Sequence, residues 1–264
     1  MNELRVLTLN IWNRSEPWEE RLELIRDGLA KLTPDIIALQ EVINLGADFD
    51  QGALVGGALG YAQAWGKSPD SPLPFGNAIL SRWPIVGSRV IALPKLDADE
   101  DRSLLHAQIG TPFGIVNFFN THLAWRLHEG HIRAVQVKAI VNMIDDTVAA
   151  HEFPPILAGD FNADPEADEV RYLRGQTTLG EARGVSFLDA YSFVNGNDVG
   201  YTFSRQNAFT LSASEPSRRI DYIFVRGPDG QRRAEPMSAK VCFDAPRRDV
   251  WASDHFGVFA TLRA

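Results

Sequence analysis

The most informative stretch of this chain runs from residue 155 to residue 162 and reads Pro155-Ile156-Leu157-Ala158-Gly159-Asp160-Phe161-Asn162. A short apolar run of this kind is typical of a buried strand, and here it stops at a carboxylate and an amide two residues apart. Polar side chains at a strand end predict an active site. The structural alternative is that Asp160 caps a following helix and Asn162 holds a turn.

The same pattern recurs along the chain, where strand-like runs carry or adjoin a polar residue. These runs are 4–9 with Asn10, 35–40 with Glu41, 114–121 with His122, 219–225 with Asp221, and 256–262 preceded by Asp254 and His255. Burying so many polar groups separately costs about 1 to 3 kcal/mol for each one left unpaired. We therefore expect them to converge on one pocket.

In their order and spacing, these motifs resemble those of the endonuclease/exonuclease/phosphatase superfamily, whose best-known members are similar to deoxyribonuclease I. The matching motifs are Asn10, Gln40-Glu41, Thr121-His122-Leu123, Gly159-Asp160-Phe161-Asn162, Arg219-Ile220-Asp221-Tyr222 and Ser253-Asp254-His255. The resemblance implies an α/β (α+β) four-layer sandwich, in which two packed mixed β-sheets are flanked by helices and the site lies at one edge. It predicts the chemistry better than the substrate.

Composition is that of a globular protein, with 264 residues of which 45 % are hydrophobic. Because the polar motifs are spread from end to end, we expect a single domain over 1–264. The net charge of −8 disfavours nucleic acid as the main partner without excluding it. The arginine pairs at 218–219, 232–233 and 247–248 are interpreted as solvated surface, with a local basic face as the alternative.

The location of the protein is predicted from what the sequence lacks. A lone cysteine, Cys242, cannot form an internal disulfide and is expected to be a buried thiol. The first residues show no secretory pattern, and no run approaches the ~18 apolar residues of a membrane span. We expect a cytoplasmic monomer without a transmembrane segment.

Two helices are predicted, over 18–31 and 128–151, each connecting two of the strands that end in polar residues. Strand-helix-strand units of this kind indicate a layered α/β architecture. Further strands are expected at 77–81, 86–93, 104–109 and 239–243. Long segments at 66–76, 175–185 and 204–217 are predicted to be loops and are candidates for the substrate rim.

Hydrolysis of a phosphate ester requires charge neutralisation on the phosphate oxygens and an aimed, deprotonated water. Glu41 is the best candidate for a Mg²⁺ ligand, because hard carboxylate oxygens suit this ion, with Mn²⁺ as a substitute. Asn10 would support the metal or the phosphate. Asp254 is expected to bind the metal or to position His255, and a second metal near Asp160 is an alternative.

The catalytic base is predicted among two residues. Asp160 is expected to orient or deprotonate the attacking water, with Asn162 fixing the water or a phosphate oxygen. The superfamily resemblance also allows His255 to be the general base, held by Asp221. Both assignments stay open at this point.

His122 is expected to donate to a phosphate oxygen or to protonate the leaving group. Its context resembles the deoxyribonuclease, sphingomyelinase and phosphatase branches of the superfamily. Apurinic endonucleases usually carry Tyr at this position and an acidic residue where this chain has Trp12, so the DNA repair branch is disfavoured.

Three residues are predicted to bind substrate. Arg102 resembles a position that holds phosphate in several branches, and Trp125 and Arg126 follow closely on His122. The alternative for each is a solvated surface position.

The predicted function is that of a Mg²⁺-dependent phosphoester hydrolase, which cleaves a phosphodiester or phosphomonoester by in-line attack of an activated water. One alternative is a nonspecific nuclease acting on DNA or RNA, which predicts a basic groove beside Glu41. Another is a lipid phosphodiesterase similar to sphingomyelinases, suggested by Asn10-Ile11-Trp12. A binding protein without catalysis is the alternative from a different class.

Overall fold

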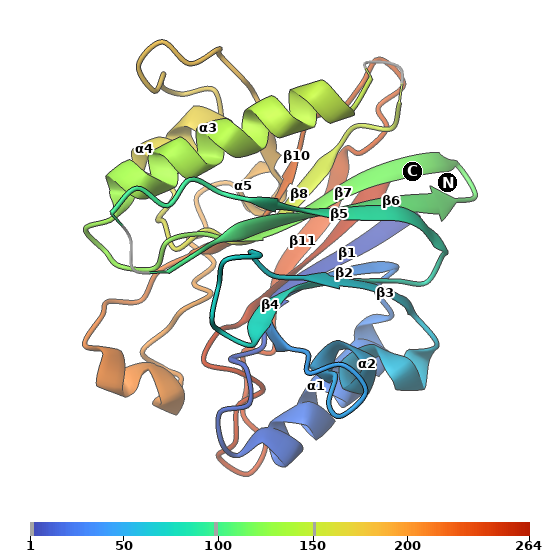
Figure 1. Cartoon of the computed structure of the whole chain (residues 1–264), viewed down its shortest axis with the longest axis vertical. Helices are drawn as coiled ribbons and strands as arrows, with labels where there is room; N and C mark the ends of the chain where they lie inside the picture. Colours follow the sequence, from blue (N-terminus) through green and yellow to red (C-terminus); the bar gives the residue numbers. More distant parts are fainter. Residues whose placement is uncertain (1–2, 98–99, 150–151) are drawn as a thin grey trace.

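Two six-stranded β-sheets pack face to face in the computed structural model, which describes residues 3–97, 100–149 and 152–264 (Figure 1). The first sheet has the order β11 (Pro236–Cys242), β12 (Gly257–Arg263), β1 (Glu3–Asn10), β2 (Ile36–Ile43), β4 (Phe75–Ser81), β3 (Ala62–Gly66). The second has the order β5 (Ile85–Ala92), β6 (Ser103–Thr111), β7 (Gly114–His122), β8 (Ile156–Asp160), β10 (Asp221–Val225), β9 (Leu188–Asp189). Each sheet mixes parallel and antiparallel pairs.

Helices cover the outer faces of both sheets. The helical segments are α1 (Trp18–Leu32), α2 (Gln51–Gly56), η1 (Gly57–Leu59), α3 (Gly130–Thr147), α4 (Asp168–Leu173), α5 (Ala190–Asn195) and η2 (Ala208–Ala213). In Figure 1, α1 and α2 lie on one side of the stacked sheets, and α3 and α4 lie on the other. The predicted four-layer sandwich is therefore confirmed.

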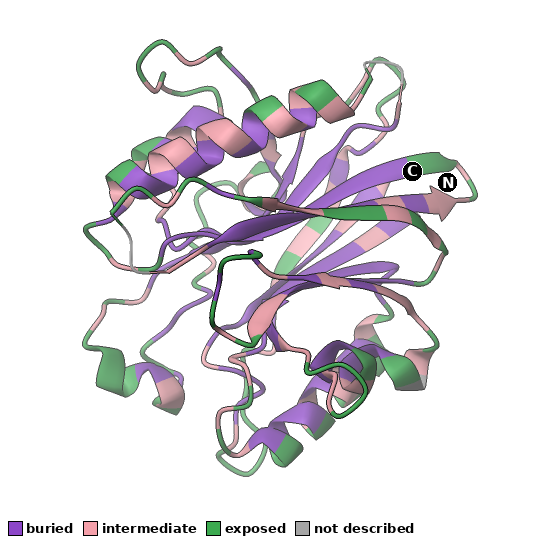
Figure 2. Cartoon of the chain, viewed as in Figure 1, coloured by how far each residue is buried: buried purple, intermediate pink, exposed green. Residues whose placement is uncertain are grey.

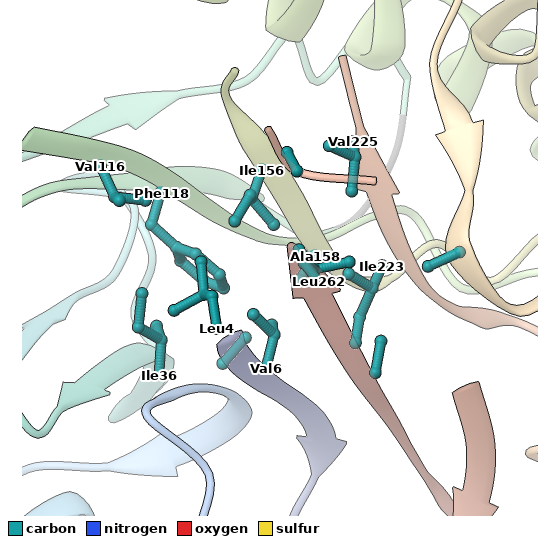
Figure 3. Packing of buried hydrophobic residues seen from close by; sticks show 14 of the residues in the cluster. Leu4, Val6, Ile36, Val116, Phe118, Ile156, Ala158, Ile223, Val225 and Leu262 are labelled. Carbon is teal, nitrogen blue, oxygen red and sulfur yellow. The ribbon is translucent and has the colours of Figure 1, made fainter. Parts of the chain in front are cut away.

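Every second side chain along the strands points into the core between the two sheets. Leu4 and Val6 of β1 point toward Phe118 and Ile156 of the second sheet, and all four side chains are fully buried (Figure 3). The next residue, Leu7, packs on the other face, with α1, because successive side chains of a strand point to opposite faces. Each such buried side chain contributes about 1.5 to 3 kcal/mol. Figure 2 shows the resulting buried centre and exposed outer helix faces.

Strand direction brings the polar motifs of the first sheet to one edge. Asn10 ends β1 opposite Gln40 of the parallel strand β2, so Glu41 follows at the same edge. Strand β12 runs antiparallel to β1, and its start therefore lies beside the end of β1. Asp254 and His255, which immediately precede β12, reach that edge as well.

The polar motifs of the second sheet lie at the same edge. His122 at the end of β7 pairs with Asp160 at the end of the parallel strand β8. Asp221 begins the antiparallel strand β10 directly opposite Asp160. The chain termini lie at the far edge, where Glu3 pairs with Arg263 (Figure 1).

Buried amides hold the two sheets together just behind this edge. Gln40 Nε2 of the first sheet donates to Asn120 Oδ1 of the second at 2.7 Å. Asn120 Nδ2 donates to the carbonyl oxygens of Leu39 and Ala78, each at 2.8 Å. Neither amide side chain is exposed, so each needs these partners, and the contacts fix the two strand edges relative to each other.

The predicted elements are found with modest differences at their ends. Helix α1 extends one residue beyond the prediction. Helix α3 begins at Gly130, because His128 lies in a turn, and ends at Thr147; residues 150 and 151 of the predicted helix lie outside the described residues. The predicted strands 77–81 and 104–109 lie within β4 and β6, whereas those at 86–93 and 239–243 match β5 and β11 but extend one residue too far. No helix in the described part of the chain is long and apolar enough to cross a membrane.

Candidate active site

A cavity of about 380 Å³ opens at the edge where the two sheets deliver their polar motifs. All the predicted site residues line it except Asp221 and Arg126; those that do are Asn10, Glu41, Arg102, His122, Trp125, Asp160, Asn162, Asp254 and His255. Two of the predicted rim loops also reach it, through Phe75 and Glu215. The 175–185 loop does not line it and instead packs near α3 and α4 through Leu179 and Ala182.

The Asp160 carboxylate is the point on which several polar groups converge. Its Oδ2 accepts a hydrogen bond from Asn10 Nδ2 at 3.0 Å and lies 3.4 Å from His122 Nε2 and 3.7 Å from His255 Nε2. Its Oδ1 accepts from the backbone N–H of Asn162 at 2.9 Å. Burial raises the pKa of Asp160 to about 7, against the opposing effect of the His255 charge.

The pKa values of the two imidazoles beside Asp160 are shifted in opposite directions. His255 Nδ1 lies 3.0 Å from Asp221 Oδ2, and Asp221 is fully buried behind it. Burial lowers the pKa of His255, but the Asp221 and Asp160 carboxylates outweigh this and raise it well above its ordinary value. Burial lowers the pKa of His122 well below its ordinary value, and the nearby Arg102 and His255 lower it further. The site thus places an imidazole with a raised pKa beside one with a lowered pKa.

Glu41 and Asp254 form a second group of carboxylates in the same cavity. Glu41 accepts hydrogen bonds from Asn10 Nδ2 at 3.3 Å and Asn13 Nδ2 at 2.8 Å, and Ser253 Oγ lies 3.2 Å from Asp254 Oδ1. Within the described residues, neither carboxylate forms an ion pair with a lysine or arginine. Burial raises the pKa of Asp254 to about 6, and the charge of Glu41 adds to the rise.

The two groups of residues differ in their fit to a divalent cation. Glu41 and Asp254 offer hard oxygen donors that form no ion pair with a lysine or arginine among the described residues, which suits Mg²⁺. Ligand atoms of Asp160, Asp221 and His255 also lie within 4.8 Å of one another. However, His255 Nδ1 lies 3.0 Å from Asp221 Oδ2 and Nε2 lies 3.7 Å from Asp160 Oδ2, so both ring nitrogens are directed toward carboxylates rather than left open to a metal. The Glu41 side is the better fit.

Arg21 supports the Glu41 side and was not predicted from the sequence. Its side chain is fully buried, its guanidinium donates to the Ile11 carbonyl at 2.7 and 3.0 Å, and it lies over the rings of Trp12 and Trp18. Burial lowers its pKa to about 10. It holds the segment that presents Asn13 to Glu41. A signal was available, since position 21 falls within the apolar stripe of the predicted helix.

Arg102 and Arg218 are buried arginines that line the cavity. Arg102 Nη2 lies 2.6 Å from Glu100 Oε2, and Arg218 forms an ion pair with Glu215. The interpretation of residues 218 and 219 as solvated surface is wrong. Arg219 is only 2 % exposed because its Nη1 pairs with the buried carboxylate of Asp189 at 2.7 Å. The other two arginine pairs lie at exposed or half-exposed positions.

Trp125 and Arg126 take different positions. Trp125 lines the cavity and is 43 % exposed. Arg126 is placed outside the cavity, because its guanidinium turns toward Glu129, at 3.2 Å, and over the Trp125 ring. It contributes instead to a separate hollow beside His128 and His131.

The local geometry of the Gly-Asp-Phe-Asn motif explains each of its residues. Gly159 has φ +145°, and a Cβ there would lie 2.0 Å from the Thr121 carbonyl oxygen, so only glycine lets β7 and β8 approach. Phe161 packs edge-on against Tyr222 in the core. Asn162 has φ +51°, and its Nδ2 donates to the Leu123 carbonyl at 3.2 Å. Asp160 caps no helix, since α4 begins only at Asp168.

Comparisons with known proteins agree with this architecture. The inositol phosphosphingolipids phospholipase C of Schizosaccharomyces pombe is 27 % identical over 98 % of this chain and 68 % of its own length. Danio rerio TDP2 in complex with a single-strand DNA product has a TM-score of 0.79 at 21 % identity, with full coverage of both chains. The human Nocturnin catalytic domain with bound sulfate has a TM-score of 0.71 at 21 % identity, over 98 % and 94 % of the chains.

Structural similarity at such identities shows the fold alone. The family of the chain is shown by a family model. The model described as the endonuclease/exonuclease/phosphatase family matches residues 7–255 of this chain. That span contains every residue found at the cavity. The protein belongs to the endonuclease/exonuclease/phosphatase family.

Proposed function

We propose that the protein is a Mg²⁺-dependent hydrolase of phosphate esters, in which a water activated in the cavity attacks phosphorus in line. The observation that carries the proposal is the convergence of Asn10, His122 and His255 within 3.7 Å of Asp160 Oδ2. The unpaired carboxylates of Glu41 and Asp254 line the same cavity. Membership of a family named for endonucleases, exonucleases and phosphatases supports the reaction class.

Glu41, Asp254 and the Asn10 amide would hold the metal ion. Bound Mg²⁺ neutralises charge on non-bridging phosphate oxygens and orients the ester. Mn²⁺ is expected to substitute, because it accepts the same hard oxygen donors. The hydrogen bonds from Asn10 and Asn13 fix the Glu41 carboxylate before the ion arrives.

Asp160 is assigned as the base that orients and deprotonates the water. Asp160 lines the cavity, and the Asn162 N–H holds its Oδ1 and thereby the orientation of the carboxylate. His255 lies between the Asp221 and Asp160 carboxylates and therefore acts as a donor, stabilising negative charge that develops on the phosphate oxygens. Of the two alternatives for the base, the proposal takes Asp160.

His122 and Arg102 complete the anion-binding side of the cavity. His122 Nε2 faces Asp160 Oδ2 at 3.4 Å, where it can donate to a phosphate oxygen or to the leaving oxygen. Arg102 lines the cavity next to His122 and supplies a second donor. Both groups are buried, so their interactions with the substrate are little screened by water.

A lipid phosphodiester is the substrate alternative with specific support. Trp125 lines the cavity and, two residues later, Leu127 is 55 % exposed, which offers apolar contact to a lipid tail. The fission yeast relative carries the name of a sphingolipid phospholipase C. A nuclease activity is supported by the fold likeness to TDP2, which was solved with DNA, and is disfavoured by the net charge of −8.

The proposal is tested with one substrate panel. Bis(4-nitrophenyl) phosphate, 4-nitrophenyl phosphate, sphingomyelin and plasmid DNA are incubated with Mg²⁺, with Mn²⁺ and with EDTA. We expect metal-dependent hydrolysis of at least one ester and its loss in EDTA. Failure to cleave any of the four with either metal would contradict the proposed function, as would rates unaffected by EDTA.

A further inference from the structure

Two arginines flank the catalytic strands of the second sheet. Arg102 immediately precedes β6, which is antiparallel to β7, and Arg218 lies three residues before β10, which is antiparallel to β8. The starts of β6 and β10 therefore lie at the edge where β7 and β8 deliver His122 and Asp160. In the sheet order, the two arginines stand on either side of the catalytic pair.

Both guanidinium groups are buried and only partly bonded. Arg102 is 7 % exposed and Arg218 is 6 % exposed. The Nε of each has no hydrogen-bond partner among the described residues. A buried guanidinium N–H without a partner is costly, and both side chains line the cavity, so a bound anion is the natural acceptor.

Each arginine is nevertheless neutralised by a nearby glutamate in its own segment of the chain. Glu100 lies two residues before Arg102, and its Oε2 is 2.6 Å from Nη2. Glu215 lies three residues before Arg218 and pairs with its Nη2. The remaining contacts of Arg218 are weak: Nη1 is 3.5 Å from the Asn162 carbonyl and 3.8 Å from the exposed Asp164 carboxylate.

The two glutamates themselves line the cavity. An ester that enters therefore meets two neutral pairs rather than two free positive charges. Its anionic oxygens gain the Nε–H donors of the arginines but also approach the carboxylates of Glu100 and Glu215. Each additional negative charge on the ester increases this repulsion.

We propose that Glu100 and Glu215 set the charge selectivity of the cavity, so that singly charged phosphodiesters are accepted over doubly charged phosphomonoesters. This inference rests on the proposed hydrolysis and names its substrate class. A phosphomonoester carries about −1.5 to −2 charges at neutral pH, whereas a diester carries one. A second negative charge on the ester would need the positive charges of the two arginines to balance it. The glutamates already neutralise those charges.

The test is to remove the glutamate charges while keeping their shape. Glu215→Gln, Glu100→Gln and the double variant are assayed with bis(4-nitrophenyl) phosphate and 4-nitrophenyl phosphate under Mg²⁺. We expect the ratio of kcat/KM for monoester to kcat/KM for diester to rise about ten-fold in each single variant, and further in the double variant. Glu181→Gln, an exposed change away from the cavity, is the matched control.

A binding measurement keeps this inference separate from the proposed hydrolysis. Inorganic phosphate, a mostly doubly charged ion near pH 7.5, is titrated calorimetrically into the wild type and into each glutamine variant. Tighter binding by the variants, with unchanged melting temperatures, supports the inference. An unchanged ester ratio together with unchanged phosphate affinity overturns it. If the wild type cleaves neither nitrophenyl ester, the phosphate affinities alone decide the charge selectivity, and the proposed function is decided separately by the full substrate panel.

Discussion

The two sides of the active-site cavity balance their charges in different ways. Around Asp160, an amide and two imidazoles surround one carboxylate, and His255 has a further carboxylate, Asp221, behind it. Around Glu41 and Asp254, the hydrogen-bond partners among the described residues are amides and a hydroxyl group. In the part of the chain that the structure describes, the first side therefore has histidines within ion-pair distance of its carboxylates, and the second forms no ion pair.

This difference indicates a division of labour. A carboxylate that is already surrounded by donors is suited to orienting water and moving a proton. Two carboxylates without a cationic partner are suited to binding a cation from solution. Arg21 lies under the second side, but its hydrogen bonds go to backbone carbonyls rather than to Glu41 or Asp254. If the two sides act separately, substitutions on one side should change the rate and substitutions on the other should change metal binding.

The largest effect is expected from Asp160→Asn. The variant keeps the side-chain shape but loses the base, so kcat for bis(4-nitrophenyl) phosphate should fall by roughly 10³- to 10⁴-fold. Mg²⁺ affinity, measured by calorimetry, should stay the same. Asp168→Asn, at an exposed position of α4, serves as the control. A near-normal rate in Asp160→Asn would show that the Asp160 side does not supply the base.

Glu41→Gln should act on metal binding. Loss of one ligand charge is expected to weaken Mg²⁺ binding by more than about ten-fold, the lower end of the effect of losing an outer-shell partner. Hydrolysis at low Mg²⁺ should fall accordingly and recover in part at high Mg²⁺. The readout is the Mg²⁺ dependence of the rate, with exposed Glu19→Gln for comparison. An unshifted Mg²⁺ dependence would remove Glu41 from the metal site.

Asp221→Asn should have a smaller effect on the rate. Asp221 touches the cavity only through His255, so the substitution leaves the pocket walls unchanged but removes the charge that keeps the imidazole cationic. We expect kcat to fall about 10²-fold with little change in KM. A rise in KM at constant kcat would instead indicate that Asp221 shapes the substrate pocket.

Arg21→Met should mainly reduce stability. It removes both guanidinium donors of the buried Ile11 carbonyl and the longer contacts to the Trp12 and Asn13 carbonyls, which is expected to lower the free energy of unfolding by about 2 to 4 kcal/mol. The rate at saturating Mg²⁺ should change least among these variants. Urea denaturation measures the first effect. Unaltered stability together with a large loss of rate would indicate that Arg21 takes part in the reaction rather than supporting the structure of the site.

Much of the site was predictable because its residues end strands or lie next to them. Asp160 and His122 follow apolar runs of clear strand character, so their place at one edge follows from strand direction. Arg21 and Arg218 were missed because a charged residue in a helix or beside another arginine is usually solvated. Their burial depends on the three-dimensional packing around Trp12 and Glu215, which local pattern does not encode.

Contacts between the sheets were beyond prediction for a related reason. Asn10 and Asp160 are separated by 150 positions in the chain, yet their side chains are 3.0 Å apart. This distance depends on the register of two sheets and on the buried amides of Gln40 and Asn120 that connect them. The position of Arg126 likewise depends on Glu129, one turn away, rather than on its distance from His122 in the sequence.

The most direct test of the two-sided site is a calorimetric Mg²⁺ titration of the wild type, Glu41→Gln and Asp160→Asn. The account predicts that Asp160→Asn binds Mg²⁺ as the wild type does and that Glu41→Gln binds it at least about ten-fold more weakly. The reverse pattern, with binding lost in Asp160→Asn and retained in Glu41→Gln, would place the metal among Asp160, Asp221 and His255 and contradict the account.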